Sequence, residues 1–599
     1  MFPKTALPDN LLKRVLYIDL ARRRSWTVER SDLFDECLGG TGVGIRLLEE
    51  ECGASMLPGT DALSAGNPII FVVGPLVGLF PLASKTVAMF KSPHTGNLGE
   101  SHAGGRSAIA IRMAGYGAIV IRGQSSMPVY LVVDGDQVFF RDATALWGLT
   151  SNYTAGAVLR EREGGAGERT ILRIGRAGEQ LVTYAGVTAE TYRHFGRLGL
   201  GAVFGSKRLK AMVIGGRCSL PVLDRKAYRT LYDEIFTAAT DSPLMKKYHE
   251  LGTAMNVLPL NGIGALPTRN LQTGRFEGAE LISGEHLAEA YLGRRVACAH
   301  CPVACVHLAA LRQPYPNDPY FYKTTMLGYD HEPIFATGSM LGISDVPGML
   351  RLMDETEIQG MDVMSTGVTL AWATEALQRG FITTQETDGL TLTFGDAETY
   401  IQATRRIVSQ PNDFYKSLAR GAEHAATIFG GLEFALTFGR NEMPGYHTGP
   451  ACHVGYLAGA RHSHLDNAGY SLDQKAVSRK EPLTPDKVAK DLLSEERWRQ
   501  VLTSLVVCLF GRGIYSEPVV LNALGVAGFN WSSEHLAQLG ADTLKRKYQF
   551  KIREGFKLDQ MRIPQRILDT PSPLGKVEEG FIRETLAKYA EYLALNPAE

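Results

Sequence analysis

The chain has 599 residues, of which 45% are hydrophobic and 21% are charged. This length exceeds what one hydrophobic core usually supports, so the sequence predicts several domains. Lys and Arg together number 63, as do Asp and Glu, so the formal net charge is zero. A chain with no excess of cations has little attraction for a phosphate backbone, and we expect no nucleic-acid partner.

The N-terminal segment 1–4 reads Met-Phe-Pro-Lys and is not followed by the apolar stretch and cleavage site of a signal peptide. The most apolar window, residues 68–83, contains Pro75 and Pro81. It falls short of the ~20 apolar residues that a membrane-spanning helix needs. We therefore expect a cytoplasmic protein without a membrane span. In such a chain, eight cysteines are more typical of metal ligands or buried thiols than of disulfides.

Runs of alternating or β-branched residues predict strands in the first third of the chain. These runs are residues 14–20, 25–29, 69–73, 118–121, 129–133 and 211–214. The short connection at 21–24 predicts a hairpin between the first two. We expect a β-rich domain that ends near residue 217.

Beyond residue 218 the apolar residues recur at three- and four-residue steps, which predicts helices. The predicted helices are 224–238, 347–359, 368–379, 397–408, 498–508 and 578–595. The expected fold class is therefore α+β, with a β-rich N-terminal base domain over 1–217 and two mainly α-helical domains over 218–431 and 432–599.

Glycine accounts for 64 residues, and several are clustered, as at 39–44 and 196–201. Such clusters either let the backbone approach a bulky ligand or form ordinary turns. No Gly-x-Gly-x-x-Gly motif occurs at 39–44, although a helix could begin there, and we see no parallel-sheet context. We therefore expect no Rossmann nucleotide site.

The strongest local signal is the segment 298–305, which reads Cys-Ala-His-Cys-Pro-Val-Ala-Cys. Three thiolates this close can bind one metal centre, and the spacing suits an iron–sulfur cluster. Zinc is an alternative, because His300 and His307 lie beside the thiols. A fourth ligand must come from elsewhere, and both Cys452 and Cys508 are candidates.

Two further segments carry groups suited to acid–base chemistry. The first is Asp330-His331-Glu332, in which a carboxylate could act as a general base. The second is a concentration of histidines near the start of the last domain, where a catalytic or metal site and ordinary packing are about equally expected. These histidines are His447, His453, His462 and His464.

Several stretches, in their order and spacing, resemble the tungsten-containing aldehyde:ferredoxin oxidoreductases nearly from end to end. The stretches are Leu38–Gly44, Lys91–Gly105, Ala114–Gly123, Gly199–Ala211, Cys298–Cys305, Gly360–Gly367, Phe394–Asp396, Glu442–Tyr446 and Leu505–Phe510. The resemblance implies a β-structured base with two helical domains over it. It also implies a tungsten bis-pyranopterin, with molybdenum as a possible replacement, a [4Fe–4S] cluster, and possibly Mg²⁺ between the pterin phosphates.

The resemblance assigns site residues one by one. The implied cluster ligands are Cys298, Cys301, Cys305 and Cys508. The implied cofactor-binding residues are Gly40, Lys85, His102, Arg197, Gly199, Gly201, Glu357, Asp362, Thr503 and Val507. The chain departs from the family pattern at five of its positions: Glu357 and Thr503 each replace an aspartate, Val506 a glycine, Lys85 an arginine and His102 an asparagine.

Near the metal, the resemblance implies a catalytic glutamate at Glu332 and a catalytic histidine at His464, with His462 as its rival. The implied reaction is oxidation of an aldehyde to a carboxylic acid, with electrons passing to a ferredoxin or a small ferredoxin-like subunit, in an enzyme that could be a homodimer. The alternatives are a reductive enzyme like benzoyl-CoA reductase, a non-catalytic iron–sulfur electron-transfer subunit, and a zinc-stapled structural protein.

Overall fold

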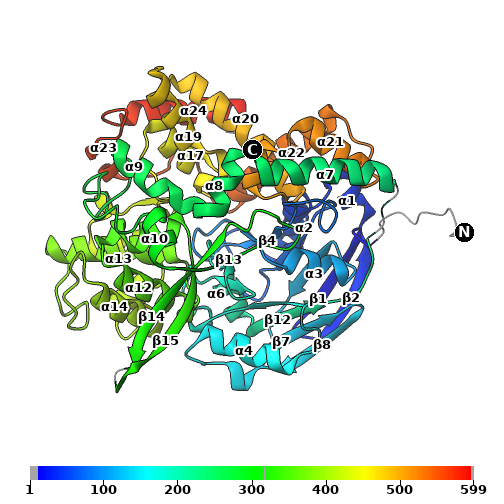
Figure 1. Cartoon of the computed structure of the whole chain (residues 1–599), viewed down its shortest axis with the longest axis horizontal. Helices are drawn as coiled ribbons and strands as arrows, with labels where there is room; N and C mark the ends of the chain where they lie inside the picture. The colour runs from blue at the N-terminus through cyan, green and yellow to red at the C-terminus, as the bar shows by residue number, and fades with distance from the viewer. Residues whose placement is uncertain (1–10, 221, 223, 316, 595–599) are drawn as a thin grey trace, which may run out of the picture.

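The computed structural model describes residues 11–220, 222, 224–315 and 317–594. The segment 1–4, which bears on the signal-peptide expectation, lies outside these residues. Two six-stranded sheets form one side of the molecule, and the helices of the later chain arch over them (Figure 1). The fold is therefore α+β, as the sequence predicts.

The first sheet has the strand order β2-β1-β6-β3-β4-β5. Its strands are β1 (Arg14–Asp19), β2 (Arg24–Glu29), β3 (Ile69–Val72), β4 (Thr86–Lys91), β5 (Leu98–Ala103) and β6 (Ala118–Arg122). The predicted hairpin is confirmed, with Arg14 opposite Glu29. Strand β3 is buried at all four positions, whereas the edge strand β2 is exposed throughout, as expected for a central and an edge strand.

The second sheet has the order β11-β10-β9-β12-β7-β8. Its strands are β7 (Val129–Asp134), β8 (Gln137–Asp142), β9 (Thr170–Arg173), β10 (Val187–Ala189), β11 (Arg193–Phe195) and β12 (Leu209–Gly215). The sequence showed no parallel-sheet context around 39–44, whereas in the fold β1 pairs parallel to β6 and β12 pairs parallel to β7. The remaining pairs within the two sheets are antiparallel, so both sheets are mixed.

The base also contains helices that the strand patterns did not predict. They are α1 (Ser31–Cys37), α2 (Gly40–Ser55), α3 (Ser107–Met113), α4 (Asn152–Arg162), α5 (Arg176–Glu179) and α6 (Leu200–Ser206). The glycine-rich segment 39–44 opens α2, as its sequence allowed, and this helix is buried from Gly40 to Leu48 except at Arg46.

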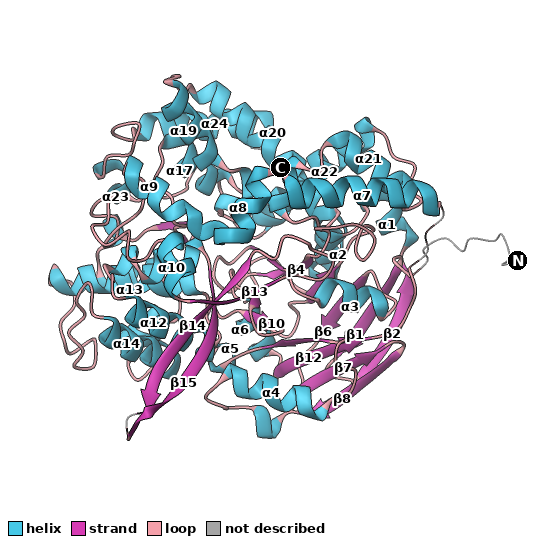
Figure 2. Cartoon of the chain, in the orientation of Figure 1, coloured by secondary structure: helices cyan, strands magenta, loops and turns pink. Residues whose placement is uncertain are grey.

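The middle of the chain is mainly helical (Figure 2). Its helices are α7 (Arg225–Asp241), α8 (Pro243–Leu251), α9 (Val257–Ile263), α10 (Gly284–Ala290), α11 (His331–Thr337), α12 (Val346–Gln359), α13 (Val363–Gln378), α14 (Ala397–Ser409), α15 (Asp413–Leu418) and α16 (Ala422–Phe429). Aspartates cap several of them, and Asp396 accepts from the Thr399 amide at 3.2 Å at the predicted start of α14.

This region also contains a three-stranded antiparallel sheet that the helical pattern did not predict. Its strands are β13 (Leu292–Val296), β14 (Val306–Tyr315) and β15 (Asp318–Tyr329). The long β14–β15 hairpin projects from the body of the molecule (Figure 2). The Cys-rich segment 298–305 is the connection between β13 and β14, so this sheet positions it.

The last part of the chain, as far as residue 594, holds a two-stranded ribbon and eight α-helices. They are β16 (Thr437–Phe438), β17 (Asn441–Glu442), α17 (Pro450–Ala458), α18 (His464–Asn467), α19 (Gly469–Arg479), α20 (Pro485–Ser504), α21 (Glu517–Val526), α22 (Ser533–Arg553), α23 (Gln565–Asp569) and α24 (Glu579–Tyr592). The predicted helix 498–508 extends too far, because the chain leaves α20 after Ser504 and Val506 adopts a φ of +53°.

One hydrophobic core runs from the first sheet through the helical regions, and a smaller one lies on the second sheet. The domain boundaries near 217 and 431 therefore stay predictions. All eight cysteines are free thiols. No helix among the described residues is both long and apolar enough to cross a membrane.

Candidate functional site

The structure brings the four predicted cluster cysteines into one region. Three lie on the β13–β14 connection, and Cys508 follows α20. The Cys508 amide donates to the Leu82 carbonyl at 2.9 Å, and the Leu82 amide donates to the His300 carbonyl at 3.2 Å. One loop of the base thus joins the two cysteine segments. Cys452 lies elsewhere, in α17, with its thiol 3.5 Å from the Tyr446 carbonyl.

The electrostatics of these thiols reflect their proximity. Burial raises the pKa of Cys301 to about 12 and that of Cys305 to about 11, and neighbouring Cys508 raises both further. Burial would also raise the pKa of Cys298, but Arg193 and Lys85 lower it below its usual value. The predicted cofactor residue Lys85 therefore lies where it stabilises a thiolate.

The backbone comes very close to Cys298. A Cβ added at Gly104 would lie 2.6 Å from the Cys298 sulfur and 3.3 Å from the Lys85 ammonium nitrogen. Any larger residue at Gly104 would displace the thiol. The loop after β5 thus needs a glycine to approach the cysteine segment.

The zinc alternative finds little support in the neighbouring histidines. Both ring nitrogens of His307 contact backbone carbonyls, those of Cys305 at 3.1 Å and His249 at 3.0 Å. Among the described residues, no three His, Cys, Asp or Glu side chains are grouped closely enough to hold a single metal ion. Ligands of a four-iron cluster stand farther apart than ligands of one ion, and four thiols with nearby cations suit such a cluster.

The segment 503–508 at and after the end of α20 carries both Cys508 and the implied cofactor-binding residues Thr503 and Val507. The Lys85 amide donates to the Val506 carbonyl at 3.1 Å. Val506 is buried and left-handed, a conformation that a β-branched residue adopts at a cost and a glycine adopts freely. The Thr503 hydroxyl donates back to the Arg499 carbonyl at 2.7 Å. Val507 is buried in the core.

Two implied cofactor-binding residues, Glu357 and Asp362, lie where α12 ends and α13 begins. Asp362 caps α13, and its carboxylate accepts from the Ser365 amide at 2.9 Å and lies 3.4 Å from Arg197 Nε. Arg197 Nη2 donates to the Glu442 carbonyl at 2.6 Å. Its buried Nη1 has no hydrogen-bond partner among the described residues, so this donor is available to an anionic group, whereas Nε faces the Asp362 carboxylate. Glu357 lies 2.7 Å from His194.

The predicted cofactor-binding glycines make close backbone contacts. A Cβ at Gly40 would lie 2.0 Å from the Thr503 carbonyl oxygen, one at Gly199 would lie 2.0 Å from the Thr183 oxygen, and one at Gly201 would lie 2.4 Å from the Gly186 oxygen. In this structure these glycines allow segments of the fold to pack against one another.

Glu332 and His464, which are 132 positions apart in the sequence, meet in space. Glu332 Oε1 lies 3.3 Å from His464 Nε2, and Glu332 Oε2 accepts from the Gly445 amide at 3.0 Å. Glu332 lies in the first turn of α11, which Asp330 caps, and His464 begins α18. His464 Nδ1 is buried and has no hydrogen-bond partner among the described residues.

Both members of this pair are predominantly neutral near pH 7. Burial raises the pKa of Glu332 to about 8, and the nearby Asp330 and Asp362 carboxylates raise it as well, against the lowering effect of Arg197. Burial, together with Arg197, lowers the pKa of His464 well below its usual value. A carboxyl pKa near the working pH suits proton transfer in either direction. Since Asp362 and Arg197 affect the pKa of Glu332, the pair lies near these two implied cofactor-binding residues.

Aromatic rings that the sequence did not single out line this pair. Tyr446 and Tyr470 stack with their centroids 4.5 Å apart, and Tyr446 lies 5.3 Å from the His464 ring. Burial raises the pKa of Tyr446 well above its usual value, and the Glu332 carboxylate raises it too. The motif Glu442–Tyr446 was visible in the sequence, but only the fold brings Tyr446 to Glu332.

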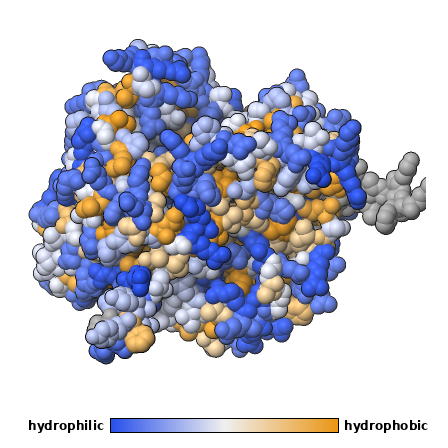
Figure 3. Space-filling view, in the orientation of Figure 1, coloured by the Kyte–Doolittle hydropathy of each residue, from blue (hydrophilic) through white to orange (hydrophobic). Residues whose placement is uncertain are grey.

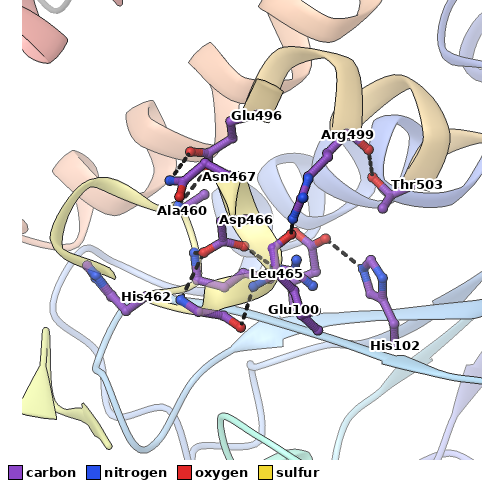
Figure 4. Close-up of polar contacts among 12 residues, drawn as sticks. Glu100, His102, Ala460, His462, Leu465, Asp466, Asn467, Glu496, Arg499 and Thr503 are labelled. Atoms are coloured by element: carbon purple, nitrogen blue, oxygen red, sulfur yellow. Dashed lines mark hydrogen bonds and ion pairs between the residues drawn. The ribbon is translucent and has the colours of Figure 1, made fainter. Parts of the chain in front are cut away.

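His462, the rival candidate, lies in a different environment. Its Nε2 accepts from the Lys551 ammonium at 3.0 Å, and its Nδ1 donates to the Tyr456 carbonyl at 2.9 Å. Both ring nitrogens are therefore occupied by the fold. In Figure 4, Arg499 reaches from α20 to the Leu465 carbonyl, with which it makes a hydrogen bond of 2.6 Å. This contact helps to hold the segment that carries His464.

His102, predicted to bind near a pterin phosphate, belongs to a buried ionic group shown in Figure 4. Its Nε2 lies 2.7 Å from Glu100 Oε1, and Lys547 pairs with the other carboxylate oxygen of Glu100. Burial lowers the pKa of His102 to about 4. Burial would raise the pKa of Glu100, but Lys547 and His102 lower it well below its usual value. A neutral His102 thus sits beside an ionised carboxylate.

Two protein-family models together match most of the chain. The family models described as "Aldehyde ferredoxin oxidoreductase, N-terminal domain" and "Aldehyde ferredoxin oxidoreductase, domains 2 & 3" match residues 15–216 and 230–595. The chain belongs to the aldehyde ferredoxin oxidoreductase family. It is therefore an oxidoreductase of a tungsten- and pterin-dependent family.

Relatives within the aldehyde ferredoxin oxidoreductase family share about a third of their residues with the chain. The tungsten-containing aldehyde ferredoxin oxidoreductase of Thermococcus kodakarensis is 31% identical over 93% of this chain and 92% of its own length. The enzyme of the same name from Pyrococcus abyssi is 32% identical over 92% and 91%. An aliphatic sulfonate oxidoreductase, WOR-like subunit, of Pyrococcus furiosus is 29% identical over 69% and 66%.

The fold also matches a solved structure. The active site complex BamBC of benzoyl coenzyme A reductase, in complex with 1,5-dienoyl-CoA, gives a TM-score of 0.82 at 20% identity. The match covers 98% of this chain and 94% of that one. At this identity the likeness supports the fold of the chain rather than its substrate.

Proposed function

We propose that the chain is a cytoplasmic enzyme that oxidises an aldehyde to a carboxylic acid. The observation that carries this proposal is the buried Glu332–His464 pair, 3.3 Å apart, near Arg197, whose Nη1 has no hydrogen-bond partner among the described residues. The reaction converts RCHO and water into RCOOH, two protons and two electrons. A ferredoxin or a small ferredoxin-like subunit accepts the electrons, and the proposed assembly is a homodimer.

The residues present suit the cofactors of this chemistry. Cys298, Cys301, Cys305 and Cys508 would hold a [4Fe–4S] cluster, beside the cations Lys85 and Arg193. Arg197, whose Nη1 has no hydrogen-bond partner among the described residues, and Asp362 would face a tungsten or molybdenum bis-pyranopterin, and His102 would lie near a bound Mg²⁺. When bound, the metal supplies two-electron redox chemistry and the cluster supplies single-electron transfer.

The chain's own residues divide the proton chemistry between them. Glu332, with a pKa of about 8, takes a proton from the attacking water in its ionised form and holds that proton next to His464. Neutral His464 donates a hydrogen bond to the substrate oxygen as charge builds there. The Gly445 amide donates to Glu332 Oε2 at 3.0 Å and holds the carboxyl group in place, so that Oε1 can accept the proton.

The test is aldehyde-dependent reduction of a viologen dye by anaerobically purified enzyme, for the natural chain and for Glu332→Gln. The substitution should lower kcat at least 100-fold, the lower end for loss of an acid–base catalyst. Tungsten and iron content should stay within about a fifth of the natural value. An equal loss of metal and activity would show that Glu332 supports cofactor binding instead.

A reductive function is the second candidate, and the rings near His464 favour it. The stacked Tyr446 and Tyr470 offer flat faces to a planar, aromatic substrate, and the fold matches a complex whose ligand is a dienoyl-CoA. Aromatic aldehydes would also suit these two rings. Stoichiometric oxidation of aldehydes with dye supports oxidation, whereas dye-driven reduction of an aromatic acyl thioester without aldehyde turnover supports the alternative.

The departures at Thr503 and Val506 favour a third possibility, a subunit that keeps the cluster and lacks the pterin metal. Thr503 hydrogen-bonds its own helix, so its hydroxyl proton is already used. Elemental analysis decides, because iron without tungsten or molybdenum would identify an electron-transfer subunit.

A further inference from the structure

Cationic side chains lie on three segments that pack around the cysteine segment 298–305. These segments are helix α8, strand β13 and the turn after Cys508. We call these cations the cationic rim. They are Lys246, Lys247, Arg294, Arg295 and Arg512.

Each of the three segments is attached to the cysteine loop or to the Cys508 turn. His249 Nδ1 lies 2.9 Å from the Val303 carbonyl, inside the cysteine segment. The Arg512 guanidinium donates to the Leu509 carbonyl at 2.9 Å, next to Cys508. Arg295 donates to the Glu250 carbonyl at 3.4 Å and so joins β13 to α8. The rim is therefore continuous with the backbone that carries the four thiols.

A ring contact holds α8 against the Cys508 turn. Tyr248 stacks on Phe510 with centroids 4.4 Å apart and ring planes within 9°. Tyr248 is buried, whereas Lys246 and Lys247 on the same helix are exposed. The helix thus packs its aromatic side on the cysteine region and presents its cations outward.

The rim is a local excess of positive charge on a chain whose net charge is zero. Arg294 and Arg295 are exposed, and Arg512 is half-buried. Glu250 is the acidic side chain next to His249 on α8, and Glu285 and Glu289 lie on the neighbouring α10. In Figure 3, hydrophilic side chains gather where β13 and the end of α8 lie in Figure 1. The four thiols below are half-buried rather than fully enclosed.

We propose that the cationic rim is the docking surface for a small acidic iron–sulfur electron carrier. This proposal rests on the proposed function, which requires electrons to leave near the cysteine segment. Each aldehyde oxidised releases two electrons and two protons, so two oxidised carriers accept one electron each. Opposite charges at the rim steer the carrier to the face where the thiols are closest to the surface, and salt weakens this steering.

The experiment compares two charge-reversal variants of the holoenzyme. The test variant is Arg294→Glu with Arg295→Glu. The matched control is Lys475→Glu with Lys487→Glu, two exposed lysines on α19 and at the N-terminal end of α20. The probe is a purified, oxidised, acidic ferredoxin with [4Fe–4S] clusters. Its binding is measured by calorimetry at low and at physiological salt, and its reduction by aldehyde is followed by absorbance.

The test variant should weaken ferredoxin binding and raise the KM for ferredoxin by at least about tenfold at low salt. The salt dependence should become shallower, while dye-linked aldehyde oxidation and the control variant stay as in the natural chain. Unchanged ferredoxin binding in the test variant, or an equal effect in the control, would overturn the proposal. Absence of dye-linked activity in the natural chain would overturn the proposed function instead, and the calorimetric comparison would still decide the docking surface.

Discussion

Replacing Glu332 by Gln should remove a specific pH dependence of stability. In the folded chain burial raises the pKa of this carboxyl from 4.5 to about 8. The folded state then holds a proton that the unfolded state has released. The stability this gives is complete below about pH 4.5 and is lost as the pH rises toward 8. The full difference corresponds to about 5 kcal/mol, of which about 4 kcal/mol falls between pH 5 and pH 8.

Glutamine is a suitable replacement because it keeps the shape and remains neutral at every pH. Its carbonyl oxygen can still accept from the Gly445 amide, which bonds Glu332 Oε2 at 3.0 Å in the natural chain. Other buried carboxyls, such as Asp473 with a pKa raised by burial to about 7, give both proteins the same trend. The difference between the two proteins therefore isolates Glu332.

The assay is urea unfolding of both anaerobically purified proteins at pH 5.5 and pH 8. Relative to the natural chain, Glu332→Gln should gain on the order of 3 kcal/mol between these two values. Infrared difference spectra of the natural chain minus the variant should show the carbonyl stretch of a protonated acid that disappears near pH 8. A carboxyl that titrates below pH 6, with no stability difference between the proteins, would refute the reasoning.

Three further outcomes follow from the site. Cys508→Ser should lower iron content and the visible charge-transfer absorbance. Cys452→Ser, in buried α17, should change neither. Equal iron loss in both variants would contradict the ligand assignment. Val506→Gly should be more stable toward urea than Val506→Ala by about 1 kcal/mol, because only glycine adopts the φ of +53° freely; a more stable alanine variant would argue against a left-handed residue there. His464→Gln should lower kcat at least 100-fold with little change in thermal stability. His462→Ala removes the acceptor of the Lys551 hydrogen bond and should destabilise the fold by about 1–3 kcal/mol. The reverse pattern would exchange the roles of the two histidines.

Local patterns in the sequence predict much of the base and of the helical regions. Alternation at 14–20 and 25–29 predicts the first hairpin, and Asp396 marks the start of α14, because these signals act through neighbours in the chain. Patterns cannot show pairing between distant strands, so the parallel contact of β1 with β6 was missed. The β14–β15 hairpin was missed because it follows directly on the cysteine segment, within a stretch dominated by helical spacing.

The site depends even more on distant contacts. The spacing of residues 298–305 predicts a metal centre, but it does not distinguish Cys508 from Cys452 as the fourth ligand. The family resemblance favours Cys508, and the hydrogen bond from the Cys508 amide to the Leu82 carbonyl holds this residue near the cysteine segment. Likewise, nothing local to Glu332 indicates His464, whereas the fold brings the two to 3.3 Å. Val506 was recognisable as a departure from the family pattern, and its left-handed backbone is one that a glycine would adopt freely.

The most direct test of the account is the metal content of the anaerobically purified chain, measured with its aldehyde activity in the same sample. The proposed enzyme should contain about one tungsten or molybdenum and about four irons per chain. It should also reduce the dye only when aldehyde is present, and Glu332→Gln should abolish this reduction. Zinc alone, or iron without tungsten or molybdenum and without aldehyde-dependent reduction, would contradict it.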